Sequence, residues 1–421
     1  MGYGQVAQAP ETMGSISGLY LDNNYYLHYP PGKDSTICMH FWLQLSVIFI
    51  APPACVTLYS SLTLNSTGMK MTDGIPEDVM EVIDPHWSSF APANPLIPHF
   101  FGILFFFLWI ISFLGNGCVI FIFLKVKSLR TPTNMFVINL ALSDLIMMTT
   151  MGPIVTVNVF MQRYWAWGAF GCRLYGFIGA VCGVVSILSM VVIGYDRYNV
   201  IVKGFNGVKI TSGKAMAILL AIWGYSIGIS LPPLMQIWGD YTTEGMLYTC
   251  SYDYLNQDWN HKSYVLFGFF FCYLIPMTMI FFFYSSIVKA VWAHEHALRE
   301  QAKKMNVDSL RSNTNANAET AEVRIAKVAV TNVSLWAGIW SPYAFVVLLA
   351  VIGSKGSITP LLSQVPSFCA KTASCFNPII YAMSHPKYRE ALTKELPCLG
   401  IEEHIDYDAG TTKETVKAEK A

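Results

Sequence analysis

Charged residues are scarce in this chain. Lysine, arginine, aspartate and glutamate make up 13% of its 421 residues, whereas a soluble globular protein carries about 25%. Hydrophobic residues account for 53%, which leaves too little polar surface for a soluble protein. The 27 basic and 27 acidic residues cancel, so net charge gives no indication of a nucleic-acid ligand. The ten cysteines form no CxxC pair, which excludes the commonest spacing of metal ligands.

Long uncharged apolar segments take the place of polar surface. A helix that crosses a membrane needs roughly 20 apolar residues. Seven segments satisfy this length and are nearly free of charge: 99–124, 135–160, 171–195, 215–238, 263–288, 328–352 and 358–383. A soluble core cannot use so many long uncharged segments. The sequence therefore predicts an all-α membrane protein with a bundle of seven transmembrane helices.

Basic residues between the spans predict the orientation of the bundle. Alternate connections carry most of them: Lys125, Lys127, Arg130; Lys203, Lys209, Lys214; Lys289, Arg299, Lys303, Lys304, Arg311, Arg324 and Lys327. The other connections hold only Arg163, Lys262 and Lys355. By the positive-inside rule, the N-terminus lies outside the cell membrane. We expect an extracellular region over 1–98, a transmembrane domain over 99–383 and a cytoplasmic tail over 384–421.

The N-terminal region contains an unusual apolar segment over 41–59 (FWLQLSVIFIAPPACVTLY). One interpretation is an eighth span or a signal anchor. Pro52 and Pro53 would break a helix in its middle, which favours an extra extracellular segment or a gene-model error. Asn65 begins an Asn-Ser-Thr triplet on the predicted outer side, and such triplets accept glycans but also occur by chance.

A short amphipathic pattern follows the seventh span. Residues 385–392 (HPKYREAL) predict a helix on the inner membrane surface that ends near Cys398. Cys398 is either a palmitoylation site or a free thiol. The polar tail beyond it offers Thr411, Thr412 and Thr415 to kinases.

Two ionisable residues, Asp144 and Lys371, lie in the middle of predicted spans, where charge is costly and needs a reason. Lys371 is the only charge in 358–383 and lies about 18 Å from the inner end of its helix. It is either an amine that forms a Schiff base with an aldehyde or a lysine ion-paired inside a transporter or channel. Asp144 has a simpler alternative as a polar contact between helices.

The loop between the fourth and fifth spans offers counter-charges to such an amine, namely Asp240, Glu244, Asp253 and Asp258. The same loop contains Cys250, which can pair with Cys172 at the outer end of the third span in an oxidising compartment. This disulfide would draw the loop over the bundle and place Glu244 above a central cavity. Otherwise Glu244 is an ordinary solvated carboxylate.

The sixth span carries a proline and several aromatic residues. Pro342 is expected to kink the helix, and Trp340 and Tyr343 share one face because they are three residues apart. They either line a pocket for a long, conjugated, apolar ligand or pack as ordinary aromatic side chains.

Short motifs recur in order through the spans: Gly115-Asn116, 139–144 (NLALSD), Asp196-Arg197-Tyr198, Trp223, Pro276, Trp340-Ser341-Pro342 and 377–381 (NPIIY). By these motifs the chain resembles the rhodopsin-like G-protein-coupled receptors. Within that family it is similar to the opsins, because Lys371 stands six residues before Asn377. His385-Pro386-Lys387 resembles a tripeptide of invertebrate visual opsins, and the segments 300–307 (EQAKKMNV) and 321–327 (AEVRIAK) resemble arthropod opsins. The resemblance covers about residues 80–400.

The resemblance implies a light-activated receptor of photoreceptor membranes, with no enzymatic activity. Its cofactor would be 11-cis retinal, or 3-hydroxyretinal, held by Lys371 as a protonated Schiff base. Its partners would be a Gq-class heterotrimeric G protein, arrestin and a receptor kinase. The alternatives are a retinal photoisomerase or a light-independent sensory receptor on the same scaffold.

The resemblance also implies roles for individual residues. Glu244, six residues before Cys250, matches the loop glutamate that serves as counterion in invertebrate opsins. Tyr175 stands where vertebrate visual opsins carry their counterion. Met151 stands where insect ultraviolet opsins carry a lysine, so a visible, long- or middle-wavelength pigment is expected. Further expected roles are retinal contact for Trp340 and Tyr343, and activation of the G protein for Asp196, Arg197, Tyr198, Asn377, Pro378 and Tyr381, with Asp144 in the same polar network.

Overall fold

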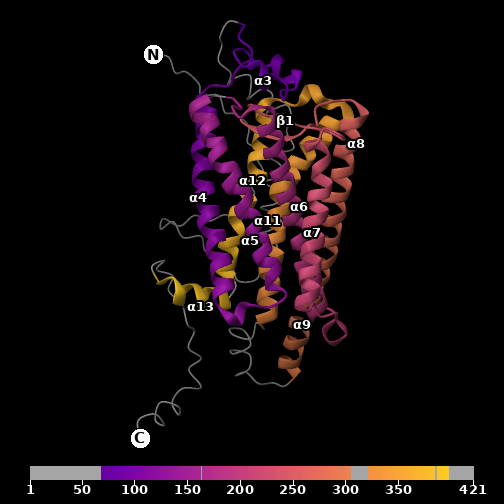
Figure 1. Ribbon diagram of the computed structural model, residues 1–421. Helices are drawn as coiled ribbons and strands as arrows, with labels where there is room; N and C mark the ends of the chain where they lie inside the picture. Colours follow the sequence, from indigo (N-terminus) through magenta and orange to yellow (C-terminus); the bar gives the residue numbers. More distant parts are fainter. Residues whose placement is uncertain (1–67, 163, 305–320, 385, 398–421) are drawn as a thin grey trace, which may run out of the picture. The chain divides into compact units, whose positions relative to one another are not determined.

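Seven helical rods form a bundle in the part of the chain that the computed structural model describes, which is residues 68–162, 164–304, 321–384 and 386–397 (Figure 1). The rods are α4 (Leu96–Lys125), α5 (Asn134–Val157), α6 (Gly168–Ile201), α7 (Ser212–Leu234), α8–η5–α9 (Trp259–Gly268, Phe269–Leu274 and Ile275–Lys304), α11 (Ala321–Leu349) and α12 (Pro360–Ser384). The predicted seven-helix membrane fold is confirmed. Three features predicted above, the 41–59 segment, Asn65 and Cys398, lie outside the described residues.

Helix α6 holds the central position in the bundle. It packs against α5, α7, α9 and α11, while α12 packs against α4, α5 and α11. Side chains of α6 that face these neighbours are buried over most of its length, as Val185, Ile187 and Met190 illustrate. A site built between α6, α11 and α12 is therefore surrounded by protein.

Among the described helices, six are long and apolar enough to cross a membrane by length and composition. The seventh rod, α12, is more polar. Its buried face carries Ser363, Gln364, Ser367, Ser374 and Asn377. Polar groups in a membrane helix face the bundle interior. The composition of α12 therefore indicates that this helix supplies polar side chains to the core of the bundle.

A proline explains one departure from regular α-helix. Pro276 has no backbone N–H, so the preceding turn cannot close in the α-helical pattern, and η5 before it is π-helical. A second π-helical turn, η3 (Asn158–Gln162), follows α5 without a proline directly after it. Helix α7 ends at Leu234, four residues before the predicted 238, because the chain turns through left-handed backbone at Gln236, where φ is 55°.

A β-hairpin lies at one end of the bundle, below α3 (Glu77–Met80) and beside η1 (Pro85–Ser89) (Figure 1). Its strands β1 (Tyr241–Glu244) and β2 (Thr249–Tyr252) are antiparallel, with Glu244 opposite Thr249. The amide N–H of Thr243 donates to the carbonyl of Val82 over 2.8 Å, which ties the hairpin to the segment above it. We call this the hairpin end.

The opposite end carries the short helices η2 (Lys127–Leu129) and η4 (Gly204–Asn206) and the helix α13 (Pro386–Glu395). The Tyr388 ring stacks on Phe123 of α4 at 5.5 Å, and Lys125 forms an ion pair with Glu395 at 2.7 Å. Helix α13 buries Tyr388, Ala391 and Leu392 and exposes its other face, which confirms the predicted amphipathic helix. On the hairpin side, η6 (Ala350–Ser354) and η7 (Lys355–Ser357) connect α11 to α12.

Candidate functional site

The amine of Lys371 lies inside the bundle, beneath the hairpin. Its Nζ donates to the Ser367 hydroxyl over 2.6 Å and to Oε1 of Glu244 over 3.3 Å. The Lys371 side chain is 11% exposed and the Glu244 side chain 2%. A buried ion pair of this kind costs desolvation energy unless further hydrogen bonds surround it.

Three hydroxyl groups surround the carboxylate of Glu244. Ser367 donates to Oε1 over 2.5 Å, Thr249 donates to the same atom over 3.3 Å, and Tyr343 donates to Oε2 over 3.2 Å. Tyr343 shares a further hydrogen bond with Ser251 at 2.6 Å. Each group comes from a different place in the chain, because Ser367 is on α12, Tyr343 on α11 and Thr249 on β2. Their hydrogen bonds hold the carboxylate in place and compensate its removal from water.

The other carboxylates of the loop face elsewhere. Asp240 pairs with Arg173, and Asp258 accepts from the backbone N–H of His261 at the start of α8. Asp253 accepts from the backbone N–H groups of Leu255 and Asn256. The hydrogen bonds from His261 lower the pKa of Asp258, whereas burial raises the pKa of Asp253 to about 6. Among the four loop carboxylates, Glu244 alone contacts Lys371.

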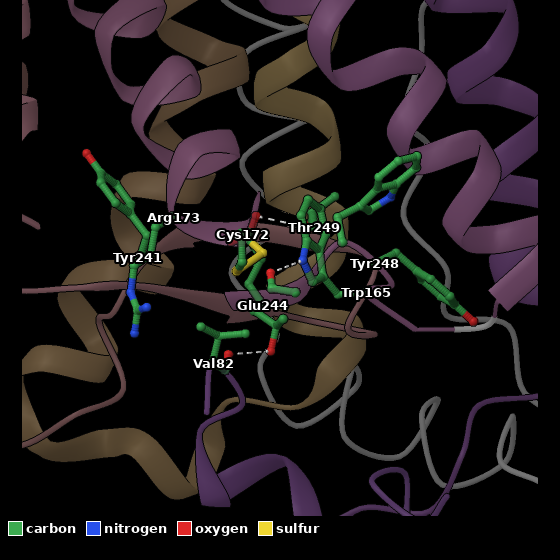
Figure 2. Close-up of a disulfide and its surroundings, with 12 residues drawn as sticks. Val82, Trp165, Cys172, Arg173, Tyr241, Glu244, Tyr248 and Thr249 are labelled. Atoms are coloured by element: carbon green, nitrogen blue, oxygen red, sulfur yellow. Dashed lines mark hydrogen bonds between the residues drawn. A yellow bond between two sulfur atoms is a disulfide. The ribbon is translucent and has the colours of Figure 1, made fainter. Parts of the chain in front are cut away.

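The Cys172–Cys250 disulfide holds the hairpin, with Glu244 on it, against the start of α6 (Figure 2). It joins the start of α6 to β2, next to Thr249 and across the strand pair from Thr243. The predicted disulfide is confirmed. The hairpin sits tightly on α6, because a Cβ on Gly176 would lie 2.5 Å from the Tyr241 ring.

An ion-pair network reinforces this anchor. Arg173, the residue after Cys172, donates to Asp240 at 2.9 Å and to Glu81 at 2.7 Å. Asp240 directly precedes β1, and Glu81 follows α3. The Arg173 guanidinium therefore connects α6, the hairpin and the segment after α3. This connection helps to fix the position of Glu244 relative to α6.

A cavity extends from Lys371 across the bundle to η5. The centre of a water-sized sphere can occupy about 150 Å³ of it. Most of its wall is apolar or aromatic, and the lining includes Met151, Tyr252, Tyr264, Phe269, Tyr273, Trp336, Trp340, Tyr343 and Lys371. Two glycines keep it open, because a Cβ on Gly179 would lie 2.3 Å from Met151 and one on Gly183 would lie 3.3 Å from Trp340.

This cavity fits a long, flat, apolar molecule with an aldehyde at one end. The amine lies at the α12 end of the cavity and the aromatic rings line its length. The Trp340 side chain lines the cavity, and its indole Nε1 is buried without a hydrogen-bond partner among the described residues. A metal is not needed for such a ligand, and no group of three potential metal ligands occurs among the described residues.

Tyr175 makes no hydrogen bond to the Glu244 carboxylate. The residue is buried, but its hydroxyl has no hydrogen-bond partner within the described part of the chain. Its ring packs edge-on against Trp165 at 5.2 Å. The structure therefore brings Glu244, Tyr343 and Lys371 together and leaves Tyr175 outside their hydrogen bonds.

The Asp196-Arg197-Tyr198 motif lies near the end opposite the hairpin. The Arg197 guanidinium donates to Asp196 over 2.5 Å, and Thr133 of α5 donates to the same carboxylate over 3.0 Å. The Tyr198 ring packs against Phe282 and Phe283 of α9. The arginine is thus held within the bundle by its own neighbour.

A polar cluster connects α5, α6 and α12 between these two sites. Asn377 donates to Asp144 over 2.5 Å, and Ser186 donates to the other carboxylate oxygen over 3.3 Å. Pro378 packs so closely on α4 that a Cβ on Gly115 would lie 2.9 Å from it. Tyr381 belongs to α12, but its side chain lies outside the described residues.

Sequence reasoning missed two of the groups that surround Glu244. Ser367 stands four residues before Lys371, and that spacing on a helix places both side chains on one face. Thr249 is adjacent to Cys250 and opposite Glu244 in the hairpin. The helical spacing was a usable signal for Ser367, whereas Thr249 required the register of the strands.

The comparisons with known proteins agree with this geometry. Residues 115–381 match the family described as 7 transmembrane receptor (rhodopsin family). The chain is 47% identical to Compound eye opsin BCRH2 of Hemigrapsus sanguineus, over 84% of this chain and 94% of that one. It is 44% identical to the Lateral eye opsin of Limulus polyphemus, over 78% and 87%.

Solved structures give the same answer. The crystal structure of squid rhodopsin superposes with a TM-score of 0.68 at 37% identity, covering 77% of this chain and 92% of that one. A cavity with an amine at one end suits the retinal chromophore that this relationship implies. The chain therefore belongs to the rhodopsin family of seven-transmembrane receptors, and within it to the opsins, which are light-activated G-protein-coupled receptors.

Proposed function

We propose that Lys371 holds 11-cis retinal, or its 3-hydroxy form, as a protonated Schiff base with Glu244 as its counterion. The observation that carries this proposal is the buried contact between Nζ and Oε1 at 3.3 Å, at the end of an aromatic cavity. Retinal supplies the light-driven isomerisation. The protein supplies the amine, the counter-charge and a site buried in the bundle.

Trp340 connects this cavity to the other half of the bundle. It lines the cavity and stacks on Trp336 at 5.2 Å. It also packs against two apolar clusters, one beneath the hairpin and the other formed mainly by α6, α9 and α11. Pro342, two residues further along α11, supplies a hinge. A push on the Trp340 ring is therefore transmitted to the end that holds Arg197, which shifts the receptor from a resting to an active population.

The proposed partners follow from that inner end. Opening of α11 away from Arg197 would uncover a site for a Gq-class G protein, with Asp196, Tyr198, Asn377, Pro378 and Tyr381 in the same rearrangement. Arrestin and a receptor kinase would then bind the activated form. In this orientation the hairpin end faces outward, Asn65 carries a glycan, and Cys398 is acylated. The extracellular region is 1–98, the retinal-binding domain 99–383 and the cytoplasmic segment 384–421.

The wavelength proposal depends on Met151. Its side chain lines the cavity and is uncharged, so α5 places no competing cation beside the chromophore at this position. We place the pigment in the visible, long- or middle-wavelength class. A role in visual phototransduction follows.

The test is a dark-minus-light spectrum of the expressed chain after incubation with 11-cis retinal. The wild type should show a visible band that light changes, and Lys371→Ala should remain colourless. The matched control is Lys355→Ala, because Lys355 pairs with Asp84 on the hairpin side and should not affect pigment formation. A visible pigment in Lys371→Ala would refute the attachment site. Light-dependent nucleotide exchange on purified Gq-class protein tests the coupling, and its absence in a pigment that bleaches normally would refute the receptor's proposed partner.

A further inference from the structure

The acceptor closest to the Lys371 amine is a neutral hydroxyl rather than the carboxylate. The Nζ–Oγ distance to Ser367 is 2.6 Å, whereas the Nζ–Oε1 distance to Glu244 is 3.3 Å. A free ammonium has three N–H groups and can donate to both. Condensation with an aldehyde releases water and leaves a protonated imine with a single N–H. Because one N–H makes only one well-aligned hydrogen bond, the nitrogen then has one main acceptor.

We propose that Ser367 is the positioning residue that receives this single N–H and passes the interaction on to Glu244. This inference rests on the proposed function, because it requires the imine at Lys371. The serine hydroxyl has one proton to donate and lone pairs with which to accept. The protonated nitrogen can only donate and the carboxylate can only accept, so the relay has one direction: Nζ–H to Oγ, and Oγ–H to Oε1.

The conformation of Ser367 supports a dedicated role. Serine in a helix commonly donates to the carbonyl four residues earlier, and Ser189, Ser226 and Ser341 of this bundle do so. Ser367 instead donates across the gap to the hairpin. It is 1% exposed and lines the cavity, so its hydroxyl faces the interior of the bundle rather than bulk solvent.

The relay also explains why the carboxylate carries so many hydroxyl contacts. Oε2 is occupied by Tyr343, and Oε1 is shared by Thr249 and Ser367. Glu244 is therefore held from three sides while standing 3.3 Å from the nitrogen. Its charge acts on the cation through the polarised Ser367 hydroxyl, since chains of hydrogen bonds strengthen one another in a site of low dielectric constant.

This arrangement has a spectroscopic consequence. In the ground state the positive charge is concentrated at the imine nitrogen, and excitation moves it along the polyene. An acceptor at the nitrogen stabilises the ground state more than the excited state. Removal of the Ser367 hydroxyl should therefore move the visible band to longer wavelength and allow the proton to leave at lower pH.

The experiment compares Ser367→Val with Ser367→Thr in the full chain regenerated with 11-cis retinal. Valine and threonine have nearly the same shape, and only threonine keeps the hydroxyl. We expect the valine variant to absorb at longer wavelength and to lose its visible band at a midpoint lower by about one to two pH units, as loss of a hydrogen bond to a charged group implies. The threonine variant should retain both properties of the wild type.

Ser363→Ala is the matched control, because Ser363 is also buried on α12 but bonds to Tyr254. It should leave band and midpoint unchanged. If valine and threonine variants have the same band and midpoint, the relay is refuted while retinal attachment stands. If the valine variant fails to regenerate, Ser367→Ala takes its place in the same comparison. A wild-type chain that forms no pigment would instead overturn the proposed function.

Discussion

Replacing Glu244 by glutamine tests the counterion, because it removes the charge and keeps the shape of the side chain. Across 3.3 Å, at an effective dielectric constant of about 20, the attraction between unit charges is about 5 kcal/mol. That energy corresponds to about 3–4 pH units in the midpoint at which the visible band is lost. The amide oxygen and the Ser367 hydroxyl still accept hydrogen bonds, so the expected fall is between about 1 and about 4 pH units.

The assay is a spectrophotometric pH titration of the dark pigment. In Glu244→Gln a near-ultraviolet band of the unprotonated chromophore should replace the visible band at a lower pH than in the wild type and revert on acidification. Asp258→Asn is the matched control, since it also changes a carboxylate of the same loop to an amide, but at an exposed position away from Lys371. An unchanged midpoint in Glu244→Gln, or an equal fall in Asp258→Asn, would refute the reasoning.

Other variants test the frame around the site. Cys172→Ser should lower the free energy of unfolding by about 2–5 kcal/mol and reduce the pigment yield. Cys118→Ser, which alters a cysteine outside the disulfide, should change neither. Equal yields from the two variants would contradict the anchoring role of the disulfide. Arg197→Glu should preserve the spectrum and impair nucleotide exchange on the G protein. Normal exchange would count against the proposed role of Arg197 in opening the site for the G protein. Burial raises the Asp253 pKa to about 6, so the folded chain keeps a proton that the unfolded chain releases above about pH 4. The melting temperature should therefore fall as pH rises from about 4 to about 6. If Asp253→Asn shows the same fall, the pH dependence does not come from Asp253.

The helices were predictable because the membrane imposes a simple rule on composition. Uncharged apolar runs located all seven rods, but they show where the hydrocarbon ends rather than where a helix ends. The fifth rod was expected to end at 288 and continues to Lys304, since 289–304 is polar but rich in alanine, lysine, glutamate and other strong helix formers. The π-helical turn η5 follows from the geometry of Pro276, which hydropathy does not register.

The site was predictable where a motif fixes a residue's place along a helix, as for Lys371. It was less predictable where contact depends on how two distant segments meet. Tyr175 has the helical position expected from the family, yet its hydroxyl makes no hydrogen bond to Glu244. Thr249 reaches Glu244 only because the strands pair in one register. A one-residue slip of β2 would move the Thr249 side chain to the other face of the hairpin.

The buried pair of Lys371 and Glu244 makes sense as a functional feature rather than as a stabilising one. Two charges removed from water lose several kcal/mol of hydration each, and their attraction often does no better than apolar residues of the same size would. The fold nevertheless supplies three hydroxyl groups, a disulfide and the Arg173 network to keep the carboxylate beside the amine. Such extensive support for an interaction that adds little net stability is expected if the function of the site depends on keeping a proton on the Lys371 nitrogen.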